Sequence, residues 1–261
     1  MILGIDSSSL TASVAILDED NDLVIAEYTV NTGKTHSQTL LPMIDEIFRL
    51  TGTVKKDITA IAVAAGPGSF TGLRIGGATA KGIAGALMIP VIPVPTVEGL
   101  AYNCYGYSEI ICPVMDARRE QTYTGIYEFV KNVGDAPVSD DKDMSEAGAY
   151  TYTMKSIMDQ CATDIGLLAD RLNELGRDTV ILGDGVPVFR EILDKKLKIA
   201  HTYAPAGINR QSAVSIARLG ARYMSEGKAV SAADFAPEYL RQSQAERETG
   251  ISADGHEGQE A

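Results

Sequence analysis

The chain has few of the residues from which many active sites are built. It holds three histidines and three cysteines among 261 residues, with no C-x-x-C spacing and no G-x-S-x-G nucleophile elbow. These absences argue against zinc, dithiol and serine-hydrolase sites. Cys104, Cys112 and Cys161 fall in or beside apolar segments. We interpret them as small core residues in a reducing compartment rather than as reactive thiols.

Basic residues and long apolar runs are also scarce. The chain has 23 Lys and Arg against 35 Asp and Glu, which gives a net charge of −12. Contact with phosphates requires a local excess of Lys and Arg, so this chain alone is not expected to bind nucleic acid. No apolar run reaches the roughly 18 residues that span a bilayer, and the strand-like N-terminus lacks the basic region of a signal peptide. We therefore expect a cytoplasmic protein without membrane contact.

The most informative feature that is present is a glycine-rich turn at residues 66–74, with the sequence GPGSFTGLR. It follows the apolar run 61–65 and opens a stretch of small residues that ends at Leu87. A strand, a turn and a helix N-terminus in this order aim free backbone N–H groups at one point, and Thr71 is the predicted N-cap. No Gly-Lys-Ser/Thr follows, so this is not a Walker A loop. The turn either holds an anion or simply joins a strand to a helix.

A second polar turn, Asp6-Ser7-Ser8-Ser9, separates two apolar strands at the N-terminus and predicts a hairpin with a carboxylate at its tip. Strands at 22–30, 59–64 and 91–95 are expected next, with helices starting near His36, Gly72 and Thr96. The order β-β-β-α-β-α-β-α is the lobe topology of the actin, Hsp70 and sugar-kinase superfamily. The residues of a possible anion or nucleotide loop are Asp6, Ser7, Ser8, Ser9, Gly66, Gly68, Ser69, Thr71 and Gly72.

The second half of the chain repeats this plan less clearly. Strands are expected at 110–115, 122–129, 157–162, 179–182 and 197–203, and helices at 165–175, from Pro187 and at 209–226. The turn from Asp116 to Glu120, which includes Arg118 and Arg119, is the counterpart of the Asp6 turn. Its carboxylates either flank a cleft with Asp6 or are an ordinary charged tip. Gly183-Asp184-Gly185 is either a second phosphate loop or a common turn.

Two lobes are therefore predicted, at residues 1–104 and 105–245, with the helix at 209–226 packing back on the first lobe. Asp164 is the expected N-cap of the helix at 165–175, and Gly176 is its C-terminal glycine. The acidic, polar stretch 131–148 predicts a loop or insert. The tail 246–261 is expected to be disordered because it has almost no large apolar residues.

Four motifs together resemble the TsaB (YeaZ-like) family: GIDSSSLTASVAI at 4–16, THSQTLLP at 35–42, GPGSFTGLRIG at 66–76 and PEYLR at 237–241. The resemblance implies an α/β, two-lobed actin-like ATPase fold (ASKHA, ribonuclease H-like). It also implies a bacterial protein required for threonylcarbamoyladenosine formation on tRNA, beside the anticodon. In that family the chain is the non-catalytic partner of TsaD, the paralogue that performs the transfer, and a small ATPase, TsaE, joins them. A partner then carries most of the tRNA contact.

The residues themselves give little support for chemistry in the first lobe. Nucleotide-binding members of the superfamily carry a glycine at the first hairpin tip and usually a basic residue just after it, whereas this chain has Ser7–Ser9 and Ser13. The resemblance implies that the catalytic paralogue holds a metal with two histidines at positions i and i+4 of one helix. In this chain His36 is at the first position, but Leu40 stands where the second histidine would be. One imidazole makes a poor metal site. We expect no catalytic residue, no metal and no tightly bound cofactor. Weak nucleotide binding, at the loop or at a partner interface, stays an alternative.

Two helices of the first lobe indicate an interface. The apolar residues after His36 fill an arc of about 180°, whereas one packed face needs roughly 100°. The helix after Gly72 has glycines where Ala would be up to about 1 kcal/mol more favourable. Its small residues allow another helix to approach, unless they pack on the chain's own sheet. The expected interface residues are Leu40, Leu41, Met43, Ile44, Ile47, Phe48, Leu73, Arg74, Gly76, Gly77, Ala80, Ile83 and Ala84. They predict a helical bundle with the TsaD-like paralogue, and a homodimer when that partner is absent.

Arg74 and Lys81 lie seven residues apart and share a helix face. They either form ion pairs with the chain's own carboxylates, or Arg74 orders the glycine-rich turn or meets an acidic group of the partner. Two functions from other classes stay open beside the scaffold. One is a small-molecule kinase or ATPase that uses the Asp6 and Gly66–Gly72 loops. The other, a metallopeptidase-like protein, ranks last because neither a metal pair nor a nucleophile–base pair is present.

Overall fold

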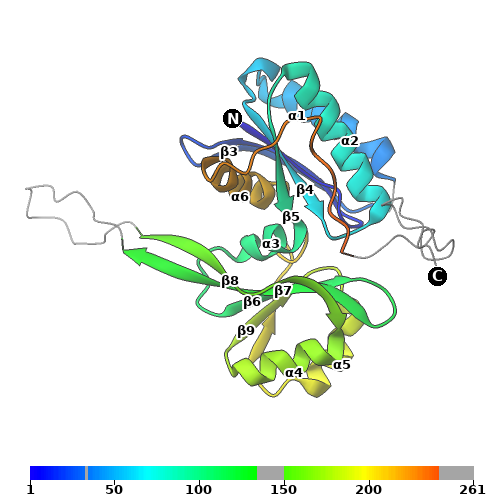
Figure 1. The fold of residues 1–261 in the computed structure, drawn as a ribbon, viewed down its shortest axis with the longest axis vertical. Helices are drawn as coiled ribbons and strands as arrows, with labels where there is room; N and C mark the ends of the chain where they lie inside the picture. The colour runs from blue at the N-terminus through cyan, green and yellow to red at the C-terminus, as the bar shows by residue number, and fades with distance from the viewer. Residues whose placement is uncertain (33–34, 134–149, 241–261) are drawn as a thin grey trace, which may run out of the picture.

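The computed structural model describes residues 1–32, 35–133 and 150–240, which form two lobes around two five-stranded sheets (Figure 1). The strand order is β3-β2-β1-β4-β5 in the first sheet and β10-β9-β6-β7-β8 in the second. In each sheet an antiparallel hairpin (β1–β2 or β6–β7) lies beside a parallel neighbour of its first strand (β4 or β9). The first lobe has the predicted β-β-β-α-β-α-β-α order.

The first lobe comprises β1 (Ile2–Asp6), β2 (Ala12–Asp18), β3 (Leu23–Val30), α1 (His36–Thr51), β4 (Ala60–Gly66), α2 (Phe70–Leu87), β5 (Val91–Pro95) and α3 (Thr96–Ala101). The second comprises β6 (Ile110–Asp116), β7 (Gln121–Val133), β8 (Tyr150–Asp164), α4 (Ile165–Leu175), β9 (Thr179–Leu182), α5 (Val186–Lys196) and β10 (His201–Tyr203). The last helix is α6 (Ala213–Ser225), and two short 3-10 helices lie at Lys55–Asp57 and Tyr102–Cys104.

The first sheet is covered on both faces, so β1 and β4 are buried along their whole length. Helices α1 and α2 pack on one face, and α6 packs on the other against β1, β2, β4 and β5. The approach of α6 is close, because a Cβ added at Gly4 would meet the carbonyl oxygen of Ala213 and one at Gly220 would meet the Cβ of Ala62. The C-terminal part of the chain therefore completes the first lobe (Figure 1).

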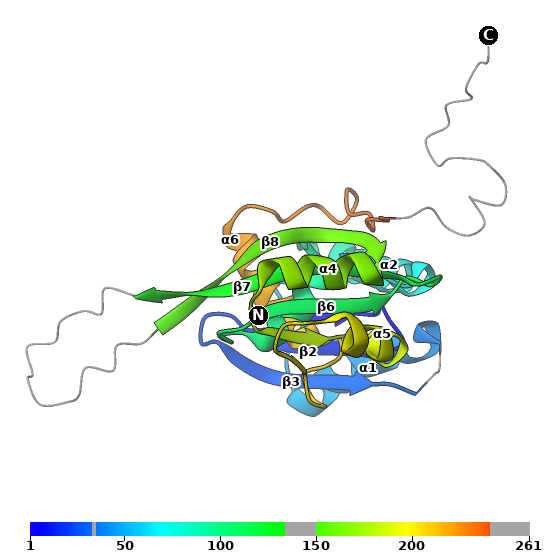
Figure 2. The same ribbon diagram turned by 90° about the horizontal axis from the view of Figure 1, so that it is seen from below.

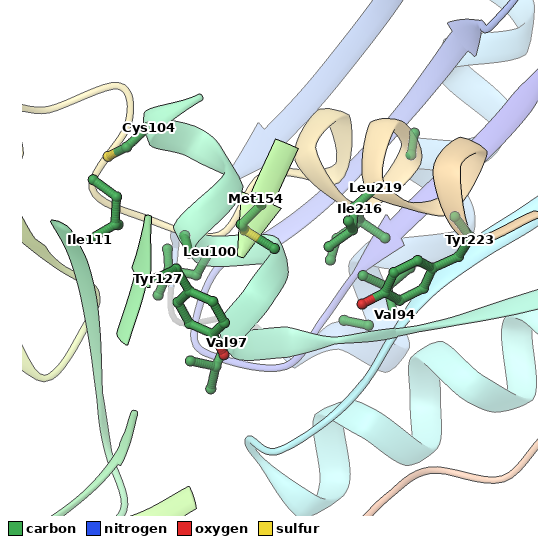
Figure 3. Close-up of a cluster of buried hydrophobic side chains, with 14 of the residues drawn as sticks. Val94, Val97, Leu100, Cys104, Ile111, Tyr127, Met154, Ile216, Leu219 and Tyr223 are labelled. Atoms are coloured by element: carbon green, nitrogen blue, oxygen red, sulfur yellow. The ribbon is translucent and has the colours of Figure 1, made fainter. Parts of the chain in front are cut away.

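The two lobes share one continuous core at their junction (Figure 3). Val94, Val97 and Leu100 from β5 and α3 contact apolar side chains of both sheets, and Tyr127 reaches this cluster from β7. The junction is also tied by polar bonds, since the Asn103 amide donates to the carbonyl oxygens of Ile208 and Arg210. The other face of the second sheet packs against α4 and α5.

Several predicted boundaries need correction. Helix α2 begins at Phe70 with Ser69 as its N-cap, whose hydroxyl accepts from the Gly72 N–H at 3.3 Å, so Thr71 lies inside the helix. Helix α6 begins at Ala213 rather than Asn209, because Ser212 provides the cap. By contrast, the predicted Asp164 cap, the bounds of α4 and the left-handed Gly176 are confirmed.

The polar stretch predicted as a loop at 131–148 is in part strand. Lys131–Val133 extend β7, which pairs with β8 as far as Val133 and Tyr150 (Figure 2). Lys131 and Asn132 are accommodated in the strand because both side chains are exposed. The rest of that stretch, 134–149, and the tail predicted to be disordered lie outside the described residues. No helix among the described residues has the length and apolar content needed to cross a membrane.

Candidate functional site

A cleft of about 680 Å³ lies between the lobes. Its walls come from the tips of the hairpins β1–β2 and β6–β7, from the turns after β4 and β9, and from the chain just before residue 241. Asp116 and Asp184 line it, and Asp6 lies behind its first-lobe wall. The structure thus brings together both predicted hairpin tips and both predicted glycine turns.

Asp6 is a buried carboxylate, with 1% of its surface exposed. Burial raises the pKa of Asp6 from 3.8 to about 6, and the negative charge of Asp184 adds to this. The backbone N–H and hydroxyl of Ser8 both donate to its Oδ1, at 2.9 and 2.6 Å, and these bonds favour the ionised form. Asp6 therefore fixes the shape of the hairpin tip.

The glycine-rich turn after β4 packs directly on this hairpin tip. The Ser69 N–H donates to the carbonyl oxygen of Ser8 at 2.6 Å, and the Ser7 hydroxyl donates to the carbonyl oxygen of Gly72 at 2.9 Å. A Cβ added at Gly68 would meet the Ser8 carbonyl oxygen, and one added at Gly72 would meet that of Ser7. The close approach that these glycines permit is therefore made by the chain's own backbone. Ser8 of the tip and Gly68 and Ser69 of the turn also line the cleft.

The second hairpin tip is open. Arg118, Arg119 and Glu120 have left-handed φ angles of 66°, 56° and 58°. Asp116 accepts from the backbone N–H of Arg118 at 2.8 Å and forms an ion pair with its guanidinium at 3.2 Å. The neighbouring turn touches the strand before the tip, because the Gly185 N–H donates to the Val114 carbonyl oxygen at 2.9 Å.

Asp184 lies in that neighbouring turn, at the second-lobe wall of the cleft. Its burial raises the pKa of the carboxyl group. Its Oδ1 has no hydrogen-bond partner in the part of the chain that the structure describes. Both wall carboxylates, Asp6 and Asp184, therefore favour the protonated state more than an exposed aspartate does.

His36 has a structural place beside the first tip. Its Nε2 lies 2.6 Å from the carbonyl oxygen of Ser9, so the imidazole ties α1 to the hairpin. Leu40, one turn later, is buried in the core. Within residues 1–32, 35–133 and 150–240, no group of three or more His, Cys, Asp or Glu side chains is arranged to hold a metal.

The other candidates for chemistry are also explained by packing. Ser13, where a cation would be expected in a nucleotide-binding lobe, is buried and accepts from the Ala213 N–H at 2.9 Å, which anchors the start of α6. Cys104 and Cys112 are buried, and burial raises the pKa of both thiols to about 12. Such thiols are poor nucleophiles at neutral pH, which confirms their reading as core residues.

The predicted interface residues of α1 and α2 divide into two sets. Ten of them are buried in the chain's own core: Leu40, Met43, Ile44, Ile47, Phe48, Leu73, Gly76, Gly77, Ala80 and Ala84. The small-residue stripe packs inward, since a Cβ at Gly76 would meet the Ser7 hydroxyl and one at Gly77 would lie 2.9 Å from the Phe235 ring. The helical wheel could not distinguish these inward faces from an outer interface.

A different face of the same helices is open to solvent. Leu41 on α1 is 57% exposed. On α2, Arg74, Ala78, Gly82 and Gly85 are exposed, and a Cβ at Gly82 or Gly85 would meet nothing within 4 Å. Between the helices lies a groove of about 290 Å³. Its lining is mainly apolar and consists of Leu3, Leu41, Ile44, Phe48, Ile58, Ile83 and Leu87, with Asp45 and Lys55 as charged members.

Residues 230–240, which we call the C-terminal strap, run along the other side of α2 (Figure 1). The Lys81 ammonium donates to the carbonyl oxygens of Ala233 and Phe235 at 3.0 and 2.9 Å, and Phe235 is 3% exposed. Tyr239 then reaches Phe70 and Arg74. Ion pairs of Arg74 and Lys81 with the chain's own carboxylates, one of the two alternatives left open by the sequence, are absent among the described residues. The PEYLR motif was the only sequence signal for this strap.

Comparison with known proteins places the chain in a family. A family model described as tRNA N6-adenosine threonylcarbamoyltransferase, TsaD, matches residues 25–249. The Bacillus subtilis (strain 168) protein named tRNA threonylcarbamoyladenosine biosynthesis protein TsaB is 32% identical over 94% of this chain and 96% of its own length. The Haemophilus influenzae protein of the same name is 27% identical over 92% and 93% of the two chains.

Solved structures show the same fold. A Pseudomonas aeruginosa protein described as similar to peptidase YEAZ superposes with a TM-score of 0.71 at 24% identity, covering 92% of this chain and 99% of that one. YeaZ from Pseudomonas aeruginosa gives a TM-score of 0.67 at 23% identity, with the same coverage. The resemblance drawn from the four motifs and the two-lobed actin-like fold are thereby confirmed. The chain belongs to the TsaB (YeaZ-like) branch of the family that the TsaD model describes.

Proposed function

We propose that this chain is the non-catalytic subunit required for formation of N6-threonylcarbamoyladenosine on tRNA. It binds a TsaD-like catalytic paralogue through the outer faces of α1 and α2, with a TsaE-like ATPase as the third component, in the cytoplasm. It contacts tRNA only indirectly, in keeping with its net charge of −12. The relatives named as TsaB support the pathway, and the exposed small-residue face of α2 beside an apolar groove supports the docking role.

The docking argument rests on residues that the isolated chain does not need. Glycine in an exposed helix costs up to about 1 kcal/mol relative to alanine. Gly82 and Gly85 have open space around them, so no packing within the described chain requires them. A helix face without large side chains lets a second helix approach closely, and the groove lined by Leu41 and Ile83 receives an apolar side chain. We therefore expect a helix–helix interface there.

The contact between the first hairpin tip and the glycine-rich turn supports the non-catalytic part of the proposal. The backbone contacts between Ser7–Ser8 and Gly68–Gly72 use the close approach that these glycines permit, which a nucleotide-binding loop would offer to a phosphate. The alternative, a small-molecule kinase or ATPase, is favoured only by the presence of a cleft between the lobes. Weak nucleotide binding is assigned to a partner interface rather than to this loop. Purified alone, the protein is expected to hydrolyse no ATP, whereas a micromolar ATP site that is lost in Asp6→Asn would support the kinase alternative.

The docking proposal is tested with Leu41→Glu. Leu41 is exposed, so the variant should keep the melting temperature of the wild type, whereas a charge placed in the interface should weaken binding of the purified paralogue at least tenfold. The matched control is Leu167→Glu, on α4 of the second lobe, where the leucine is 63% exposed. Titration calorimetry gives the affinities. Unchanged binding by Leu41→Glu would contradict the proposed surface.

The same variant tests self-association. The wild type alone should be a dimer at micromolar concentration in light scattering, and Leu41→Glu should be a monomer. Ile44 and Ile47 are unsuitable for this purpose, because both are buried in the first-lobe core and a charge there would unfold the chain. A monomeric wild type would exclude the homodimer while leaving the paralogue interface to the calorimetric test.

A further inference from the structure

Arg74 is held in one orientation on the outer face of α2. Its guanidinium carbon lies 3.9 Å from the centroid of the Phe70 ring. Its Nε donates to the hydroxyl of Tyr239, 3.3 Å away. The Tyr239 ring packs on Phe70 with a centroid separation of 4.8 Å. An arginine that is both stacked and hydrogen-bonded through Nε keeps its plane fixed, unlike a freely rotating surface arginine.

The donors that remain on Arg74 have no carboxylate to bind. A guanidinium carries five N–H groups, and the contact with Tyr239 uses only the one on Nε. Arg74 is exposed, and in the ranges that the structure describes no ion pair includes it. The two terminal nitrogens therefore form a planar fork that is open to solvent.

The C-terminal strap fixes Tyr239 from far along the sequence. The Glu238 N–H donates to the Ala65 carbonyl oxygen at 2.7 Å, immediately before the residue that meets Arg74. Earlier in the strap, Phe235 is buried and Lys81 binds two of the strap's carbonyl oxygens. Because these anchors are made before any partner arrives, the orientation of Arg74 requires no ordering on binding.

The geometry points to Arg74 as a preorganised receptor for a carboxylate of the protein that docks on α2, with Tyr239 as its positioning residue. A planar fork of two nitrogens matches a carboxylate in bidentate fashion. Arg74 is the fifth residue of α2, so the positive end of the helix dipole lies close to it. It shares the exposed face with Ala78 and Gly82, where a partner helix would lie. The inference rests on the proposed function, since the partner is the protein bound by that face.

The test compares Arg74→Ala, Arg74→Lys and Tyr239→Phe in calorimetric titrations with the purified paralogue. Both Arg74 variants should bind about 10- to 100-fold more weakly, because a lysine keeps the charge but loses the fork. Tyr239→Phe should weaken binding a few-fold and should have no further effect in the Arg74→Ala background. Arg171→Ala is the matched control, because Arg171 is a half-exposed arginine paired with Glu174 on α4 of the second lobe. All variants should keep the wild-type melting temperature.

The partner's carboxylate is found by replacing its Asp and Glu residues one at a time with Asn and Gln. One replacement should weaken binding of the wild type but not that of Arg74→Ala. NMR relaxation of the Arg74 Nε–H group tests the preorganisation without any partner. This group should be ordered in the free wild type and mobile in Tyr239→Phe. A mobile Arg74 side chain in the free wild type would overturn the inference.

Other outcomes separate this inference from the proposed function. If Arg74→Lys binds the paralogue as tightly as the wild type does, while Leu41→Glu binds more weakly, the docking surface is supported. The role of Arg74 as a carboxylate receptor is then contradicted. If Arg74→Ala lowers only the binding of tRNA to the assembled complex, the ligand is a phosphate and the inference is again overturned. If the wild type does not bind the paralogue at all, the proposed function itself fails.

Discussion

After β4 in the first lobe and after β9 in the second, a glycine-containing turn packs against the hairpin strand next to it. In the first lobe the turn touches Ser7 and Ser8, beyond Asp6, and so covers the hairpin tip. In the second lobe the turn touches Val114 and the backbone nitrogen of Asp116, and Arg118 beyond it is exposed. The contact therefore reaches further along the hairpin in the first lobe, where Ser7 and Ser8 are buried, than in the second, where Arg118 is exposed.

The consequence reaches α2. Because the first turn is bonded to the hairpin on one side and leads directly into α2 on the other, the start of this helix is fixed relative to the sheet. The outer face of α2 can then carry small residues without loss of position. In the second lobe α5 is also attached to its hairpin, through the bond from the Gly185 N–H to the Val114 carbonyl oxygen, but this contact lies nearer the start of the hairpin strand. The contact between the turn and Ser7–Ser8 thus buries part of the first hairpin tip and fixes the start of α2 at the same time.

Gly72→Ala should have the largest effect on this comparison. The new Cβ would meet the Ser7 carbonyl oxygen, and backbone on both sides cannot give way cheaply. We expect a loss of about 2–3 kcal/mol in the free energy of unfolding, measured in urea. The control, Gly82→Ala, lies in the same helix in open space and should gain up to about 1 kcal/mol. A Gly72→Ala protein as stable as the wild type would show that the turn does not pack closely against Ser7.

Asp6 gives an intermediate effect that depends on pH. Its folded-state pKa of about 6 lies above the value of 3.8 expected when unfolded, so proton binding favours the folded state. Relative to Asp6→Asn, the wild type should gain about 1 kcal/mol of stability as the pH falls from 7 to 5. Urea unfolding at several pH values measures this difference. Ser8→Ala should move the pKa of Asp6 still higher, since it removes a hydrogen bond to the ionised form. Parallel pH profiles for the wild type and Asp6→Asn would contradict the burial of this carboxylate.

Arg119→Gly at the open tip should have the smallest effect. Arg119 has a φ of 56°, which glycine adopts without the strain that a side chain introduces. The variant should therefore be more stable by about 0.5–1 kcal/mol. Arg171→Gly in α4 serves as the control and should lose about 1 kcal/mol. A destabilised Arg119→Gly would mean that the arginine side chain supports the tip.

Much of the fold could be predicted from local patterns. The bounds of β5, α4 and β9 agree with the sequence because apolar runs there end at residues with clear signals, such as Asp164 and Gly176. The missed caps, Ser69 and Ser212, compete with nearby residues of similar capping strength. The length of β7 and β8 was missed because pairing between the two strands, rather than burial, sustains their polar ends.

The candidate site was less predictable than the fold. The glycine-rich turn and the Asp6 tip were both recognised, but their contact joins residues more than sixty positions apart, as in the bond from Ser7 to Gly72. The inward face of α2 was mistaken for the outer one, because the strap around Phe235 and the sheet each bury a separate stripe. No periodicity in a single helix reveals two internal neighbours. Tyr239 was noted in a motif, but only the fold brings it to Arg74.

The return of α6 and the C-terminal strap to the first lobe sets the order of events during synthesis. The first sheet leaves the ribosome early, but the helix that covers its second face, Ala213–Ser225, is made only near the end of the chain. Until then the cluster that holds Ile2 and Val94 lacks the apolar side chains of α6, such as Ile216 and Leu219. The second lobe is continuous from β6 to β10 and has no such delay. A truncated chain that ends just before Ala213 therefore contains every strand and helix of the later lobe, while its earlier lobe still offers chaperones an open apolar face.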